Sequence, residues 1–271
     1  MSARRFRLLV AVVTATCALS VAPAAAVPAD VRTCTADDGH RTPVVLLHGT
    51  LDDATVWNEL SAQLRSAGYC VYAPTYGATG SLLGLGGAAP VAQSAAEVAE
   101  YISRVLEVTG ARQVDLVGHS QGGTIAAYYA KVLGRAARVR SAILLAPVSH
   151  GTTLGGAVET AERVPGLRGT VDSVVLPVFC AACADLETGS AFLDSLDAGP
   201  IAQPGVRYAV LATRDDAVST PPGTASFIDE PGVTNLFVQE LNPAPVLHRD
   251  LPRDATSRRW ILEQLNQTTR R

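Results

Sequence analysis

Short, continuous apolar runs bounded by turn residues recur along the chain. They cover residues 44–47, 69–73, 114–117, 142–146, 208–212 and 233–238. Strands of a parallel sheet are buried on both faces, so they form uninterrupted apolar segments rather than alternating ones. The pattern therefore predicts about six buried strands.

Helical patterns lie between these runs, with apolar residues three or four positions apart. The faces are Trp57, Leu60 and Leu64; Val98, Tyr101, Ile102 and Val105; Ile125, Tyr128, Tyr129 and Val132; and Trp260, Ile261 and Leu265. The first three are followed by a glycine that can end a helix. Strands and helices in alternation imply right-handed crossovers. We predict an α/β fold, a doubly wound, mostly parallel sheet with helices on both faces, in one domain over residues 27–271.

Two stretches interrupt this alternation. Residues 76–90 are rich in Gly and Leu, and residues 148–205 are rich in Gly, Ala and Pro. Both follow strand ends, and ligands of doubly wound sheets bind outside the carboxyl ends of the strands. We expect them to form pocket walls, with a small cap from 148–205; the alternative is that they are plain connecting loops.

Composition narrows the class of protein. The 271 residues are 48% hydrophobic and 17% charged, with a net charge of −3. So many apolar residues exclude intrinsic disorder. A near-neutral balance without a dense basic run leaves no electrostatic footprint for nucleic acid.

The first 26 residues have the layout of a secretory signal peptide. Arg4, Arg5 and Arg7 form a charged start, a largely apolar run follows over 8–22, and 24–26 offer a small-residue cleavage site. The apolar run is shorter than the roughly 20 residues that span a bilayer. We predict removal of residues 1–26 and secretion of the mature chain without stable membrane insertion.

Without the signal peptide the chain keeps four cysteines, Cys34, Cys70, Cys180 and Cys183. An even number in an exported protein favours disulfides over free thiols. Four cysteines allow three pairings, and we expect Cys34 to pair with Cys70 and Cys180 with Cys183. The alternative for the second pair is half of a zinc site, but no second Cys or His pair stands at ligand spacing. We expect no metal.

The clearest chemical signal is the pentapeptide GHSQG at residues 118–122. It lies between the apolar run 114–117 and the helical pattern that contains Ile125. G-x-S-x-G between a buried strand and a helix is typical of the sharp turn that presents a nucleophilic serine above a sheet. The alternative is a purely structural glycine turn. We predict that Ser120 is a nucleophile.

A serine hydroxyl needs a histidine base that is oriented by a carboxylate. On this kind of sheet the chain order is Ser, acid, His, and only His150 and His248 follow the serine. His248 leaves room for an acid-bearing strand in between, whereas His150 does not. The acid should follow the 208–212 run, where Asp215 and Asp216 compete. The pattern by itself does not choose between them.

Acyl transfer passes through an oxyanion that needs two N–H donors. We expect one from Gln121, directly after the nucleophile, and one from Thr50, after the first strand. His48 precedes the nucleophile, so we interpret it as a residue that shapes the Thr50 loop. His119 is expected to point away from the nucleophilic hydroxyl.

The segment GLGGAA at residues 84–89 matches the dinucleotide fingerprint G-x-G-x-x-A. That fingerprint should begin directly after a strand. Here it begins about ten residues later, so we interpret it as an apolar loop and expect no cofactor.

Four segments carry a resemblance to a known family: PVVLLHG at 43–49, GYCVYA at 68–73, GHSQGG at 118–123 and ATRDDAV at 212–218. Over nearly all of the mature chain, the sequence resembles the secreted bacterial lipase and esterase branch of the α/β-hydrolase superfamily. Relatives carry an aspartate, one residue and a valine after the penultimate strand, which implies Asp216 as the acid. The chain departs from them at Asn242 and Leu247, where a cysteine and an acidic residue are common.

The resemblance and the predicted triad together imply a secreted, monomeric hydrolase of carboxylic esters. We expect Leu82, Leu83, Leu85 and Leu154 to line a groove for the acyl chain of a lipid, which favours a lipase or carboxylesterase acting on medium to long acyl esters. Acyl transfer and polyester hydrolysis are alternatives on the same fold. The alternative from another class is a non-catalytic secreted binding module.

Overall fold

A computed structural model describes residues 42–78 and 84–267. The predicted signal peptide, Cys34, Leu82 and Leu83 lie outside these ranges. Six strands form one sheet in the order β2-β1-β3-β4-β5-β6, and every neighbouring pair is parallel. Their bounds are β1 (Val44–Leu47), β2 (Val71–Tyr72), β3 (Val114–His119), β4 (Val139–Leu145), β5 (Arg207–Ala212) and β6 (Thr234–Phe237). The predicted fold class is confirmed.

The sheet separates two hydrophobic cores. In β1, Val45 and Leu47 pack into one core, whereas Val44 and Leu46 pack into the other, and all four are fully buried. Successive side chains of a strand point to opposite faces, so a strand covered on both sides needs an apolar residue at every position. This is the physical reason for the continuous apolar runs.

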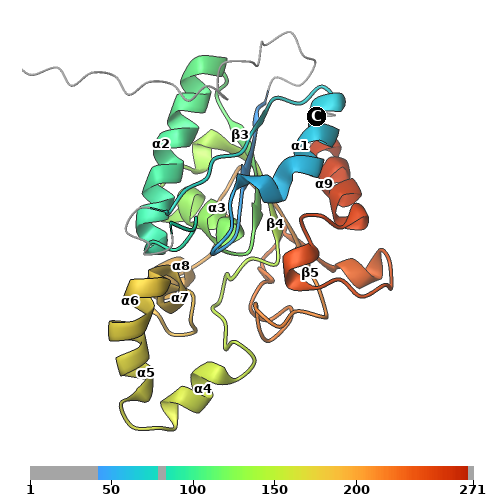
Figure 1. Cartoon of the computed structure of the whole chain (residues 1–271). Coiled ribbons are helices and arrows are strands. Elements are labelled where there is room, and N and C mark those ends of the chain that lie inside the picture. The colour runs from blue at the N-terminus through green and yellow to red at the C-terminus, as the bar shows by residue number, and fades with distance from the viewer. Residues whose placement is uncertain (1–41, 79–83, 268–271) are drawn as a thin grey trace, which may run out of the picture.

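Helices cover both faces of the sheet. Figure 1 shows α2 and α3 on one side and α1 and α9 on the other. The helices are α1 (Asn58–Ser66), α2 (Val91–Thr109), α3 (Gln121–Lys131), α4 (Ala157–Glu162), α5 (Leu167–Thr170), α6 (Leu176–Phe179), α7 (Ala181–Asp185), α8 (Ala191–Asp197) and α9 (Ala255–Gln267). Helix α2 ends at Gly110, whose φ of 66° is left-handed, and this is the conformation in which glycine ends a helix.

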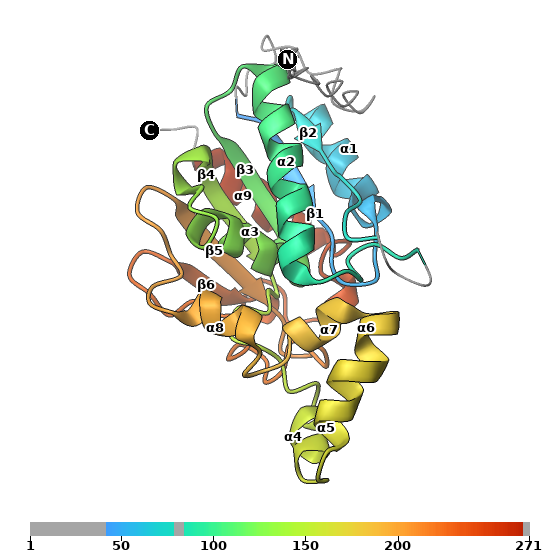
Figure 2. The ribbon, with the colours of Figure 1, turned by 90° about the vertical axis from the view of Figure 1, so that its left-hand side faces the viewer.

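Helices α4, α5 and α6 form an arm, residues 157–179, that extends away from the sheet (Figures 1 and 2). Arg168 connects the middle of the arm to the segment that follows α7. Its guanidinium lies 3.3 Å from the Glu187 carboxylate and donates to the Thr188 carbonyl at 2.9 Å. The arm lies within the stretch expected to contribute a small cap, and its action as a cap stays a prediction.

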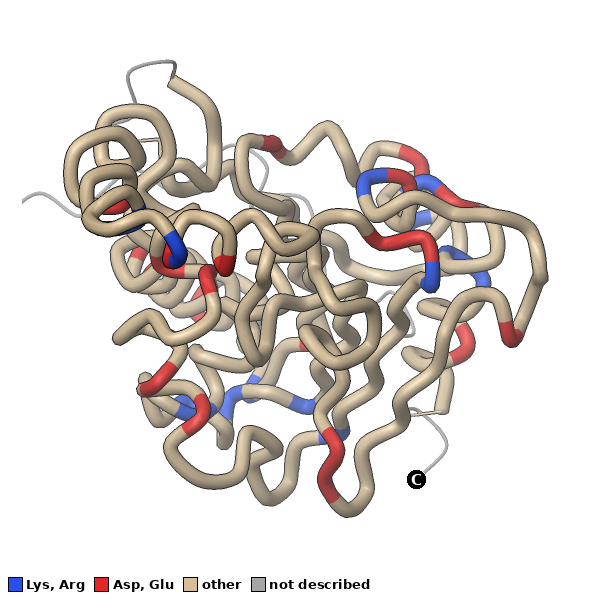
Figure 3. The backbone as a smooth tube through the Cα atoms, turned by 90° about the horizontal axis from the view of Figure 1, so that it is seen from below, with Lys and Arg blue, Asp and Glu red and all other residues tan. Residues whose placement is uncertain are grey.

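Charged residues of both signs are interspersed around the molecule (Figure 3). Among the described helices, none is long and apolar enough to cross a membrane.

Candidate active site

Ser120 stands on the sharp turn between β3 and α3. Its φ of 54° and ψ of −125° place a non-glycine residue in a strained backbone conformation, as a nucleophile elbow requires. The turn is anchored on both sides, because the Ser120 N–H donates to the Leu145 carbonyl at 2.8 Å and the Gly123 N–H donates to the Ser120 carbonyl at 2.9 Å. The serine is thereby held at the carboxyl edge of the sheet.

The two outer glycines of the pentapeptide are required by close backbone approach. A Cβ on Gly118 would lie 2.4 Å from the Gly122 carbonyl oxygen, and a Cβ on Gly122 would lie 2.2 Å from the Leu47 carbonyl oxygen. Real Cβ atoms do not come this close to backbone. Only glycine lets α3 start so near to β1 and β3.

His248 and Asp216 meet beside this turn. The Nδ1 of His248 lies 2.8 Å from Oδ2 of Asp216, and the other carboxylate oxygen of Asp216 accepts the N–H groups of Val218 and Ser219 at 2.8 and 2.7 Å. Both side chains are buried. A carboxylate on Nδ1 leaves Nε2 as the basic nitrogen, and Nε2 of His248 has no hydrogen-bond partner among the described residues.

Asp215 contacts the loop that carries His248, but at a different residue. Its Oδ2 accepts the Val246 N–H at 3.1 Å and the Gln239 side-chain amide at 2.9 Å. The two neighbouring aspartates therefore hold one loop at two points: Asp215 the backbone at Val246, Asp216 the imidazole of His248. Sequence pattern leaves this choice open because both residues follow the strand end.

His48 is buried and orients the turn that carries Thr50. Its Nε2 accepts the Tyr76 N–H at 3.2 Å, so its Nδ1 carries the proton and donates to the Gly49 carbonyl at 2.8 Å. Burial lowers the pKa of His48 below its ordinary value, which keeps the ring neutral. The carbonyl and the N–H of one trans peptide point in opposite directions, so this bond turns the Thr50 N–H away from His48.

The glycine-rich segment 84–89 packs its backbone against this turn. A Cβ on Gly87 would lie 2.8 Å from the Gly49 carbonyl oxygen and 2.5 Å from the Gln121 side-chain oxygen. Leu85 is 39% exposed and does not line the cavity described below, contrary to the expectation. The reason is that the segment approaches the site with its glycines, which leaves the leucine side chain on the outside.

His119 contacts the loop of His248. Its Nε2 lies 3.0 Å from the His248 carbonyl oxygen, and the two rings are 4.8 Å apart, tilted by 46°. Burial, followed by the neighbouring His248, lowers the pKa of His119 well below its ordinary value. The expectation for His119 concerned only the nucleophilic hydroxyl, and the carbonyl contact is a feature that sequence reasoning missed.

Ser120 and His248 line one cavity of ≈ 260 Å³, together with Thr50 and Leu154. Gln121, the other expected oxyanion donor, is not among the residues that line this cavity; as the first residue of α3, it has an N–H without an intrahelical acceptor. The stretch 148–205, expected to form pocket walls, contributes Val148, Thr152, Cys183 and Leu186 to the wall, although no sequence pattern singles out these four residues. The wall also contains Gly49, Asp52, His119, Val218 and Arg249.

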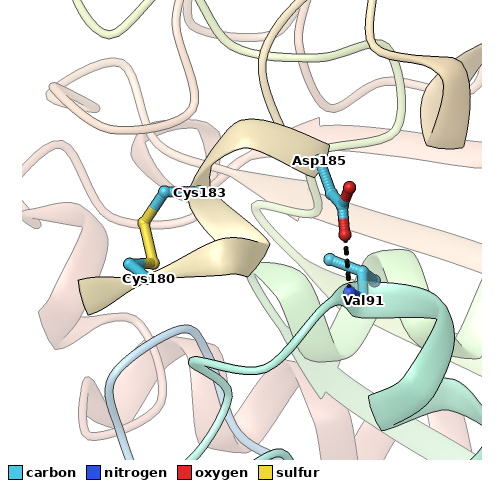
Figure 4. Close-up of a disulfide and its surroundings, with 4 residues drawn as sticks. All are labelled: Val91, Cys180, Cys183 and Asp185. Atoms are coloured by element: carbon cyan, nitrogen blue, oxygen red, sulfur yellow. Dashed lines mark hydrogen bonds between the residues drawn. A yellow bond between two sulfur atoms is a disulfide. The ribbon is translucent and has the colours of Figure 1, made fainter. Parts of the chain in front are cut away.

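A disulfide between Cys180 and Cys183 stands in this wall (Figure 4). The same segment is tied to α2, because Oδ2 of Asp185 accepts the Val91 N–H at 2.8 Å. Burial raises the pKa of the Asp185 carboxyl. The bond predicted between Cys34 and Cys70 stays a prediction, since Cys34 lies outside the described ranges. Within those ranges, no three His, Cys, Asp or Glu side chains are grouped as metal ligands.

The other histidine after the serine lies elsewhere. The Nδ1 of His150 is 2.8 Å from Oδ1 of Asp197, and its Nε2 is 3.0 Å from the Phe227 carbonyl oxygen. His150 borders an open groove and does not line the cavity of Ser120. Both of its ring nitrogens are engaged.

The sequence matches the Alpha/beta hydrolase family over residues 44–267. This chain belongs to the α/β hydrolase family. The match covers β1 through α9 and includes the elbow, both aspartates and His248.

The family membership is accompanied by similarity to lipases. A triacylglycerol lipase of Burkholderia plantarii is 31% identical over 163 residues, which are 57% of this chain and 42% of that one. A triacylglycerol lipase of Pseudarthrobacter phenanthrenivorans is 31% identical over 147 residues, 51% of this chain and 44% of that one. The α/β hydrolase chain thus spans less than half the length of these curated relatives.

Solved structures show the shared fold. A lipase of Bacillus licheniformis in its mature form superposes with a TM-score of 0.59 at 17% identity, over 84% of this chain and 93% of that one. A monoacylglycerol lipase of Paleococcus ferrophilus gives a TM-score of 0.55 at 20% identity, over 84% and 96%.

Proposed function

We propose that this α/β hydrolase cleaves carboxylic esters, with Ser120 as nucleophile, His248 as base and Asp216 as the acid that orients it. The observation that carries the proposal is that His248, bonded through Nδ1 to Asp216, lines the same cavity as Ser120 and keeps Nε2 without a partner among the described residues. The similarity to triacylglycerol lipases supports an ester as substrate.

In the proposed reaction Ser120 Oγ attacks the ester carbonyl while Nε2 of His248 takes its proton. The resulting oxyanion accepts the N–H groups of Thr50 and Gln121. Collapse breaks the bond to the leaving alkoxide, which receives the proton from His248, and leaves an acyl ester on Ser120. Water then attacks the acyl group while His248 accepts its proton. Collapse breaks the bond between the acyl carbon and Ser120 Oγ, His248 returns the proton to Oγ, and the carboxylic acid departs.

The cavity supports an apolar acyl group. Its walls contain Val148, Leu154, Leu186 and Val218, and each buried methylene contributes about 0.8 kcal/mol. A lipid ester fits such walls. Secretion belongs to the proposal as well and rests on the sequence of residues 1–26.

The test combines active-site labelling with a substrate series. A serine-directed phosphonate should label Ser120 alone, and Ser120→Ala should abolish both labelling and turnover. Rates over p-nitrophenyl esters of increasing chain length, and over emulsified triglyceride, then separate lipase from esterase. Label on another residue would contradict the proposed nucleophile, and a rate maximum at acetate with untouched emulsions would leave a short-chain esterase.

A further inference from the structure

His119 ends β3 directly before the serine, and its ring is buried. Its Nε2 lies 3.0 Å from the carbonyl oxygen of His248, a residue 129 positions further along the chain. A carbonyl oxygen only accepts hydrogen bonds. Nε2 of His119 must therefore carry a proton and donate it to this carbonyl.

The ring of His119 contacts two parts of the site. Its Nδ1 would lie 3.2 Å from a Cβ on Gly49. Its centroid is 4.8 Å from that of His248. Nδ1 has no hydrogen-bond partner among the described residues. The carbonyl of His248 is thus the contact that fixes the polar edge of this ring.

The environment keeps this ring uncharged. Burial lowers the pKa of His119 most, His248 lowers it further, and the bond to the His248 carbonyl raises it by less. A second imidazolium beside His248 would oppose protonation of the base. A neutral His119 can donate to the backbone without that repulsion.

We propose that His119 is a positioning residue, which holds the carbonyl of His248 and thereby sets where the imidazole of His248 stands relative to Ser120. This inference rests on the proposed function, in which His248 is the base. Asp216 and His119 hold different parts of His248. Asp216 fixes the ring of His248 through Nδ1, and His119 fixes the backbone from which that ring extends.

Two substitutions separate the hydrogen bond from the space that the ring fills. In His119→Gln the side-chain amide nitrogen can reach the place of Nε2 and donate, whereas His119→Phe keeps a ring and cannot donate. With a soluble p-nitrophenyl ester, we expect the Phe variant to lose about 10- to 100-fold in kcat, since a displacement of about 1 Å costs about that much. KM should change by less than about threefold, and the Gln variant should recover most of the kcat.

A spectroscopic readout reports the base itself. The deshielded proton NMR resonance of His248 Nδ1–H, in its bond to Asp216, should be sharp in the wild type and in His119→Gln. It should be broadened in His119→Phe, because the backbone of His248 is no longer held. His119→Met is a second variant without a donor, since a flexible Met side chain adapts to irregular space, and it serves if the Phe variant does not fold.

The matched control is His150→Gln. His150 also has a carbonyl 3.0 Å from its Nε2, that of Phe227, but it lies outside the cavity. We expect its kcat to equal that of the wild type. A wild-type kcat in the Phe and Met variants would overturn the proposal, and so would equal losses in the Gln and Phe variants, because ring volume would then be the cause. Full activity of Ser120→Ala would instead overturn the proposed function.

Discussion

The described residues contain two histidine–aspartate pairs with the same hydrogen-bond length and different surroundings. His248 and His150 each have Nδ1 2.8 Å from a carboxylate oxygen, of Asp216 and Asp197 respectively. In the first pair Nε2 has no partner among the described residues, whereas in the second it meets the Phe227 carbonyl. A bond to a carboxylate therefore does not distinguish the two histidines; they differ in the partner of Nε2 and in that only His248 lines the cavity of Ser120.

Burial separates the two pairs further. The side chains of His248 and Asp216 are 8% and 1% exposed, whereas those of His150 and Asp197 are 37% and 41% exposed. Exposed ion pairs contribute little to stability, about 0–1 kcal/mol. His150 borders an open groove of ≈ 780 Å³. The pair of His150 and Asp197, the outer pair, is thus a surface contact, whereas His248 lines the cavity of Ser120.

The strongest way to break this comparison is to remove each histidine in turn. His248→Ala should lower kcat on a p-nitrophenyl ester by about 10⁶-fold, since the base and the nucleophile act as a unit. His150→Ala should leave kcat within about twofold of the wild type, because surface changes are close to neutral. Steady-state kinetics on both purified variants measure this, with circular dichroism as the control for folding.

The activities of the two variants have to be read together. A large loss in His150→Ala, with an active His248→Ala, would make the outer pair catalytic and would contradict the proposed triad. Phosphonate labelling of Ser120 should follow the same order, because the proposed base also activates the serine toward the phosphonate: the label should be lost in His248→Ala and kept in His150→Ala.

Substitutions of the aspartates test the same comparison through the carboxylate partner of each histidine. Asp216→Asn should lower kcat by about 10⁴-fold, since an amide stabilises the wrong tautomer of the base. Asp215→Asn keeps one acceptor for the Val246 N–H, so we expect a loss of less than about tenfold, consistent with one weakened hydrogen bond. Asp197→Asn is the matched control in the outer pair and should retain wild-type kcat. Equal losses in the first two variants would show that the bond to His248 does not decide the role.

A smaller effect concerns acid stability. The pKa of His119 is lowered in the folded protein, so below about pH 6.5 the unfolded chain binds a proton that the folded chain does not. The free energy of unfolding should then fall as pH falls, by up to about 1.4 kcal/mol per pH unit from this group. In His119→Gln the glutamine does not titrate, so the unfolded variant takes up no proton at this position. Urea unfolding between pH 5 and 8 should show the difference between wild type and variant narrowing toward acid; parallel curves would contradict it.

The smallest effect belongs to the cavity wall. Cys180 and Cys183 close a short loop, and the loop-entropy relation assigns about 2 kcal/mol or less to a bond of this span. The double variant Cys180→Ser/Cys183→Ser should lose only a few degrees in Tm. Because Cys183 lines the cavity, the ratio of rates for long and short acyl esters should shift as well. An unchanged ratio would show that this wall does not contact the acyl chain.

Most of the sheet and of the main helices could be predicted from the sequence. The run at 114–117 lies within β3, and the helical face from Ile125 to Tyr129 lies within α3, with Val132 as the C-cap residue. Such elements follow from local periodicity, and the elbow between them follows from two glycines that no other residue can replace at these backbone distances. Leu85 shows the limit of such prediction. The sequence reveals that this residue is apolar, but it does not reveal that the loop exposes the side chain and keeps it out of the cavity.

The sequence by itself predicted the six strands, the helices α1, α2, α3 and α9 and the turn that carries Ser120, but not the short helices α4 to α8. Only the tertiary structure showed that Asp216 and not Asp215 contacts the His248 ring, that both ring nitrogens of His150 are engaged elsewhere, and that His119 contacts the His248 carbonyl. The physical reason is that periodicity and turn chemistry act over a few residues, whereas these contacts join residues 31, 32 and 129 positions apart. Their partners are set by how the carboxyl ends of the strands are brought together, which no local pattern encodes.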